Sequence, residues 1–197
     1  MCWVEPSLTL TDPMLKRDEI RDRLVDAELL WQSGRKNGAF IQVLIALAGL
    51  SRLRYAKKTS PKVYFDKMRE YHPKQKSQIA ANEKKQKRNK LSDGQQFKCI
   101  VLDLLEDTIL PNPKPGVHPP KYNVSLPFSK DKRTNIEVLF YKVLRCTAIH
   151  QGTFASVAYL TERTPEGDVL HLTEPAGIPE WWVIHLIEAM RKTPELS

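Results

Sequence analysis

Residues 39–50 read AFIQVLIALAGL, and this least polar stretch of the sequence decides the fold. It is too short to cross a membrane, which takes roughly 18 or more apolar residues. Its length suits a helix that is apolar all round and therefore buried. Arg52 and Arg54 follow it, at the end of a helix where the dipole favours positive charge. We predict a helix over about residues 37–57 at the centre of a helical bundle.

The flanking segments predict further helices around this one. Each carries apolar side chains at three- and four-residue steps, and two of them open on a capping residue followed by proline, at residues 12–13 and 60–61. The expected helices cover about residues 13–34, 60–73, 95–110, 131–150 and 179–191. The fold class is therefore predicted to be mainly α, a helical bundle of about five to six helices in a single domain over residues 1–197.

Three segments add to this bundle. Residues 74–92 are predicted to be a basic helical insertion, because Ala, Gln, Lys and Glu favour helix. Residues 111–128 contain six prolines and are expected to form a long extended loop. Residues 155–192 change to an alternating pattern on either side of a turn at 165–168, which predicts a small C-terminal β-hairpin before the last helix.

The composition narrows the class of protein. A hydrophobic fraction of 41% and a charged fraction of 27% are typical of a globular chain. The three cysteines have no metal-ligand spacing, so we expect no metal, no cofactor, no disulfide framework and a cytoplasmic location. No basic segment followed by an apolar run opens the sequence, so neither secretion nor a membrane partner is expected. The net charge of +8 favours an anionic partner, nucleic acid first.

Residues 74–90 concentrate the positive charge. The segment has almost no large apolar side chains and a single acid, Glu83. Cations that follow one another on an exposed helix suit the phosphates of RNA. The candidate RNA-binding residues are Lys84, Lys85, Lys87 and Arg88. A solvated linker with no partner is the alternative interpretation of such a charge run.

Arg145 and His150 stand at the end of the predicted helix over residues 131–150. Cleavage of RNA by its own 2′-hydroxyl needs proton transfer and a donor for the phosphoryl oxygens. Histidine titrates near neutrality and arginine offers a fork of donors to phosphate, so the pair suits this chemistry without a metal. Alternatively, Arg145 caps the helix and His150 is a surface histidine.

The face of this helix that carries Arg145 is predicted to lie away from the core. Arg145 follows Tyr141 and Glu137 at four-residue steps, on a different stripe from the apolar one that runs through Phe140. We therefore expect Arg145 not to be a simple packing residue.

The spacing Arg145-x-x-x-x-His150, at the end of an apolar helix, resembles the motif of the HEPN superfamily of all-helical ribonuclease domains. Residues 31–55 are also similar to the helical hairpin that opens many of those domains. The resemblance implies a HEPN-like fold and a metal-independent endoribonuclease of toxin or defence type. It places Arg145 on the scissile phosphate and His150 in proton transfer, with two protomers of a homodimer meeting at the cleft.

Two supporting residues follow from the same resemblance, Tyr141 and Cys146. The position after the arginine is commonly polar in active members, and here it is Cys146. The resemblance leaves open whether an antitoxin protein is a further partner. Two other classes remain as alternatives, a non-catalytic RNA- or nucleotide-binding helical module and a helical dimerisation domain.

Overall fold

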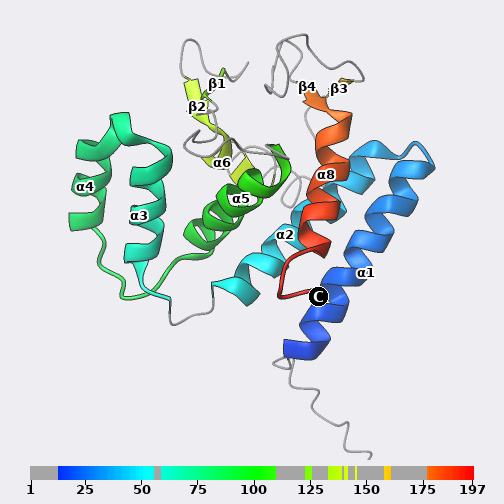
Figure 1. Ribbon diagram of the computed structural model, residues 1–197, viewed down its shortest axis with the longest axis horizontal. Helices are drawn as coiled ribbons and strands as arrows, with labels where there is room; N and C mark the ends of the chain where they lie inside the picture. Colours follow the sequence, from blue (N-terminus) through cyan, green and yellow to red (C-terminus); the bar gives the residue numbers. More distant parts are fainter. Residues whose placement is uncertain are drawn as a thin grey trace, which may run out of the picture.

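The apolar stretch at residues 39–50 forms the middle of α2, which is the central helix of the bundle in the computed structural model (Figure 1). Phe40, Leu44, Leu47 and Leu50 are among the largest fully buried side chains. Helices α1, α5 and α8 all pack against α2. The prediction of a central buried helix in a mainly helical fold is confirmed.

The structure describes residues 13–55, 59–109, 123–125, 133–138, 140–141, 145, 158–160 and 177–197. The longer helices are α1 (Pro13–Gln32), α2 (Lys36–Arg54), α3 (Pro61–Tyr71), α4 (Lys76–Lys84), α5 (Asp93–Ile109) and α8 (Glu180–Arg191). Each of them overlaps a segment for which the sequence predicts helix, and α5 begins two residues before its predicted start. The predicted single domain over residues 1–197 stays a prediction.

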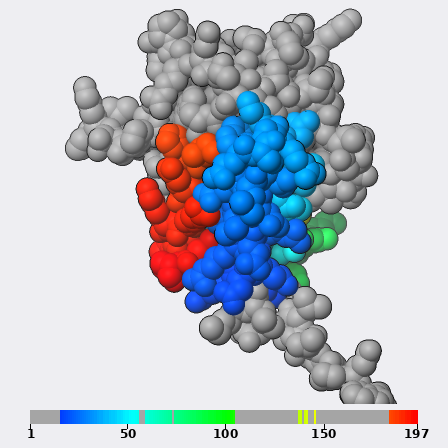
Figure 2. Space-filling view, turned by 90° about the vertical axis from the view of Figure 1, so that its right-hand side faces the viewer, coloured from blue at the N-terminus to red at the C-terminus, as the bar shows by residue number. Residues whose placement is uncertain are grey.

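Helices α1 and α2 form an antiparallel hairpin that turns at Gly34. Gly34 has a φ of +77°, a left-handed conformation that favours glycine and suits the position after the end of α1. On the face seen in Figure 2, α8 lies against α1. Arg21 of α1 donates to the carbonyl oxygen of Leu196 at 2.8 Å, and Arg191 of α8 pairs with Glu28. The C-terminal residues are thereby fixed to the first helix.

Helices α3 and α4, joined by the short 3-10 helix η1 (Pro73–Gln75), lie on the opposite side of the molecule from α1 (Figure 1). Ser60 caps α3 by accepting from the backbone N–H of Lys62 at 3.3 Å. The backbone N–H of Leu91 donates to the carbonyl oxygen of Thr59 at 3.2 Å. The chain therefore leaves the bundle and returns to it at nearly the same place.

The basic insertion is helical over only part of its predicted range. Helix α4 ends at Lys84, and residues 85–92 follow without helical structure. Lys84 would lie one helical turn from both Lys87 and Arg88, and like charges at that spacing disfavour helix. A reciprocal cap between Ser92 and Gln95 then starts α5, with Ser92 N–H donating to Gln95 Oε1 at 2.9 Å.

The start of the predicted helix over residues 131–150 is wrong. Strand β2 (Arg133–Asn135) occupies this position and pairs antiparallel with β1 (Asn123–Ser125), which lies inside the predicted proline-rich loop. Val124 and Thr134 are backbone partners in this register, and both are β-branched residues, which favour strands. The helix α6 (Ile136–Val138) begins only after β2.

The C-terminal hairpin stays a prediction. Strand β3 (Ala158–Leu160) lies where its first strand is expected, and it pairs in parallel with β4 (Gly177–Pro179), directly before α8. The predicted turn at 165–168 and the second strand lie outside the described residues.

Beyond α6, Phe140, Tyr141 and Arg145 have the wider backbone of a π-helix. Phe140 is buried and meets Phe40 of α2 edge to face, with ring centroids 6.0 Å apart. Its predicted place on the inward stripe is confirmed.

The predicted outward stripe is wrong at its first two members. Glu137 is fully buried and bonds to buried His72, with His72 Nε2 3.0 Å from Glu137 Oε1. Tyr141 packs on Phe97 of α5, with ring centroids 5.9 Å apart. The segment touches α2 on one side and α3 and α5 on the others, so both of its stripes are covered.

Gly94, near the start of α5, allows the Tyr141 ring to come close. A Cβ at Gly94 would lie 2.8 Å from Tyr141 Cζ. We expect Gly94→Ala to lower the free energy of unfolding by about 1–2 kcal/mol, because overpacking outweighs the better helix propensity of alanine. Urea denaturation measures this. Gly38→Ala is the control, since its Cβ would lie 3.4 Å from Leu30 Cδ1, and equal stability of the two variants would contradict the expected overpacking.

Candidate nucleic-acid interface

A groove with a volume of about 760 Å³ lies between α3, α4 and α5. Its apolar lining comes from Phe65 and Met68 of α3, Ile79 of α4 and Val138 of α6. Phe65, Met68 and Ile79 are buried parts of the core, so the α3–α4 hairpin is held firmly against the bundle. A groove of this size between packed helices is large enough for a ligand.

Among the described residues, the charged side chains that line the groove are all positive. They are Lys85, Lys87, Arg88 and Lys98, and no carboxylate of the described residues lines the groove. Three of these cations come from the segment that the sequence singled out for RNA binding. Lys84, the fourth predicted RNA-binding residue, is exposed at the end of α4 and is not part of the lining.

The predicted RNA-binding cations have no acidic partner in the part of the chain that the structure describes. Within the described part of the chain, no ion pair joins Lys84, Lys85, Lys87 or Arg88 to a carboxylate. Glu83, the single acid of the segment, is held by Arg69, whose Nη1 lies 2.7 Å from Glu83 Oε2. The bond to Glu83, with that to Asp66, raises the pKa of Arg69. The rim of the groove therefore presents positive charge to solvent.

Arg145 and the groove residue Lys98 both contact the ring of Tyr141. Its guanidinium carbon is 5.3 Å from the ring centroid of Phe97 and 5.4 Å from that of Tyr141. Lys98 Nζ is 5.7 Å from the same Tyr141 ring and 5.9 Å from the ring of Tyr64. Cations over aromatic faces are attracted by the ring quadrupole. These stacked groups connect the predicted catalytic arginine with the lining of the groove.

The Arg145 side chain is partly buried, although the sequence predicts that its stripe lies away from the core. Its Nε is buried and has no hydrogen-bond partner among the described residues. No carboxylate of the described residues forms an ion pair with it. A guanidinium that stacks on two rings and lacks an acidic partner is positioned for an anion such as phosphate.

The predicted site is only partly described. Tyr141 contacts Arg145, as a supporting residue would. His150 and Cys146 lie outside the described residues. The proximity of Arg145 and His150 therefore stays a prediction.

Tyr64 and Lys98 are groove residues that the sequence did not single out. Both lie on helices whose pattern predicts only core packing, so no local signal marks them. Burial, together with the nearby carboxylate of Glu137, raises the pKa of Tyr64 to about 12. Its hydroxyl is protonated at neutral pH, as that of an ordinary tyrosine is.

Cys99 is fully buried in α5. Burial raises the pKa of its thiol to about 12, so the thiolate is not populated at neutral pH. Among the described residues, no group of His, Cys, Asp and Glu has the arrangement of a metal site.

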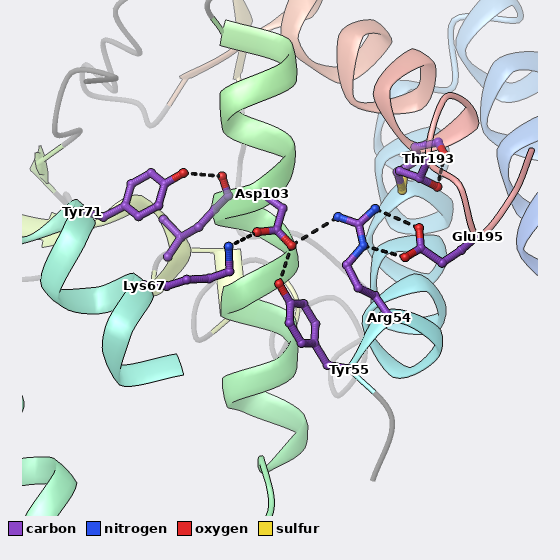
Figure 3. A network of polar contacts seen from close by, with 9 residues as sticks. Arg54, Tyr55, Lys67, Tyr71, Asp103, Thr193 and Glu195 are labelled. Carbon is purple, nitrogen blue, oxygen red and sulfur yellow. Dashed lines mark hydrogen bonds and ion pairs between the residues drawn. The ribbon is translucent and has the colours of Figure 1, made fainter. Parts of the chain in front are cut away.

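A second cluster of charged groups joins α5 to α2, α3 and the C-terminal residues (Figure 3). Asp103 accepts from Tyr55, Lys67 and Arg54, the last at 3.2 Å. Arg54 also forms a two-pronged pair with Glu195, with both N–O distances at 2.8 Å. The bond to Glu195 and that to Asp103 raise the pKa of Arg54, and Arg54 lowers the pKa of Glu195. Each group has its partner inside the cluster, so we assign it to stability.

Comparisons with family models, with characterised proteins and with solved structures found no match to this chain. Among the described helices, none is both long and apolar enough to span a lipid bilayer.

Proposed function

We propose that this domain binds RNA in the groove between α3, α4 and α5 and cleaves it as a HEPN-type, metal-independent endoribonuclease of toxin or defence type. The observation that carries the proposal is the charge of the groove, because its described lining contains Lys85, Lys87, Arg88 and Lys98 and no carboxylate. Phosphate neutralisation by such side chains supplies most of the affinity of non-specific RNA binding.

The proposed chemistry assigns one role to each motif residue. Arg145 binds the scissile phosphate and stabilises the charge that develops on its oxygens. His150 transfers a proton during attack by the 2′-hydroxyl. Two copies of the chain form the cleft as a homodimer in the cytoplasm, and an antitoxin protein is a further candidate partner. The stacking of Arg145 on Phe97 and Tyr141 supports its role, because it orients the guanidinium in advance.

A non-catalytic RNA-binding module is the second candidate. The burial of Arg145 Nε favours it, because an arginine that packs on two rings can serve structure alone. Incubation of the purified chain with RNA in EDTA separates the two candidates. Shortening of the RNA supports the endoribonuclease, whereas stable binding without shortening supports the module.

Reversal of charge at Lys84, Lys85, Lys87 and Arg88 to glutamate tests the groove itself. We expect RNA affinity to fall by about tenfold or more. The dependence of log Kd on log salt should become shallower by about one for each phosphate that the variant no longer neutralises. Fluorescence anisotropy at several salt concentrations measures both quantities.

A matched control keeps the change in net charge the same. It reverses four exposed cations elsewhere on the chain, Lys16, Arg17, Arg35 and Lys192. The control variant should lose less affinity than the groove variant. Unchanged RNA affinity in the groove variant would contradict the proposal and favour a helical dimerisation domain.

A further inference from the structure

Three amide side chains form a stripe along one wall of the groove. Gln75, Gln78 and Asn82 follow one another at three- and four-residue steps on η1 and α4, so they share a helix face, and all three line the groove. Lys85 follows at the next step of the same stripe and lines the groove as well. Along the chain direction, this wall therefore carries three amide side chains followed by one cation.

These three amides are available to a ligand. Among the described residues, the side chains of Gln75, Gln78 and Asn82 make no hydrogen bond. Two other amides of the lining are used locally. Gln86 donates to the carbonyl oxygen of Arg88 at 3.3 Å, and Gln95 accepts from Ser92 as part of the α5 cap.

An amide carries a donor and an acceptor side by side, which matches the edge of a nucleobase, whereas lysine and arginine offer donors alone. Lysine and arginine suit phosphates through their charge, and asparagine and glutamine can form paired hydrogen bonds with a base edge. The stripe from Gln75 to Asn82 extends over about 10 Å, given the rise of a helix. Stacked bases repeat at about 3.4 Å along a strand, so the stripe spans about three nucleotides.

We infer that the groove is a base-reading subsite for about three nucleotides of single-stranded RNA, with Gln75, Gln78 and Asn82 on base edges and Lys85, Lys87 and Arg88 on phosphates. This inference rests on the proposed RNA binding and adds sequence preference to it. A single strand is required, because pairing in a duplex occupies the Watson–Crick edges of the bases.

Binding of short A, C, G and U homopolymers to the full chain tests the inference. Fluorescence anisotropy should show a difference of about tenfold or more between the best and the worst homopolymer, the size expected for a few base-edge hydrogen bonds. A blunt RNA duplex should bind more weakly than the best single strand. The triple variant Gln75→Ala, Gln78→Ala, Asn82→Ala should bind all four homopolymers alike while it keeps the salt dependence of the native chain.

The controls separate base reading from folding and from charge. Alanine favours helix, and circular dichroism will show whether α4 is retained in the triple variant. Gln32→Ala with Asn37→Ala removes two exposed amides near the α1–α2 turn and should keep the base preference. Equal affinity of the native chain for all homopolymers, equal affinity for the duplex, or a preference that survives in the triple variant would each overturn the inference and leave RNA binding standing. Absence of binding to any RNA would overturn the proposed function, and the base-reading subsite with it.

Discussion

Replacement of Arg145 by alanine is expected to slow RNA cleavage in EDTA by at least about a hundredfold, the usual cost of removing a donor that stabilises developing negative charge. Binding of RNA should change much less, because Lys85, Lys87 and Arg88 of the groove remain. His150→Ala should slow cleavage by about a hundredfold or more, as expected for loss of a general acid or base. Single-turnover cleavage with excess enzyme measures the rate without a contribution from product release.

Two further variants keep this test independent of folding. Arg145→Lys retains a cation over Phe97 and Tyr141 but lacks the planar fork, so it should fold and still cleave slowly. Arg17→Ala removes an exposed arginine of α1 and should cleave at the native rate. Native rates in both Arg145→Lys and His150→Ala would remove these two residues from the mechanism.

Replacement of Asp103 by asparagine should lower the free energy of unfolding by about 2–3 kcal/mol. The Asp103 side chain is only 14% exposed, and three helices meet at its carboxylate through Arg54, Tyr55 and Lys67. Loss of the negative charge leaves two partly buried cations with one acid fewer, which costs more than the mean hydrogen bond. The expected loss of unfolding free energy is smaller than that for breaking a fully buried ion pair, because solvent reaches this cluster. Urea denaturation at neutral pH measures it.

Tyr55→Phe is the matched control for this variant, because it removes one hydrogen bond of Asp103 and keeps the ion pairs. It should cost about 1 kcal/mol. Equal losses in Asp103→Asn and Tyr55→Phe would show that the charge of Asp103 contributes little.

The same cluster sets the pH dependence of stability. Burial and the bond to Asp103 raise the pKa of Tyr55 far above its usual value near 10, so its contribution is complete below pH 10 and is lost as the pH rises further. Arg54 lowers the pKa of Glu195, so that contribution is complete above about pH 4.5 and is lost as the pH falls.

The helices were predictable because each carries its own local signal. The apolar stretch at residues 39–50 and the proline caps at Pro13 and Pro61 mark burial and helix starts without help from the rest of the chain. Two boundaries were not predictable from the same rules. Strand β1 exists through its pairing with β2, and α4 ends early where cations repel one another and the cap of α5 begins.

The site was predictable only where its residues are neighbours in sequence. Lys85, Lys87 and Arg88 belong to one charged run, and all three line the groove. Lys98 and Tyr64 reach it from α5 and α3, which the sequence describes as packing helices. The buried Glu137 forms a hydrogen bond with His72, which lies 65 residues away in the sequence. No local sequence pattern predicts such a pair.

The return of the chain at residues 59 and 91 has a consequence for how this protein varies. One backbone hydrogen bond joins these two positions, so the segment that contains α3 and α4 begins and ends at neighbouring points of the bundle. Its length and exposed residues can vary without changing the distance that the backbone must cover between α2 and α5, as long as Phe65, Met68 and Ile79 keep their places in the core. Evolution can therefore change the ligand specificity of the α3–α4 hairpin while the bundle of α1, α2, α5 and α8 stays the same.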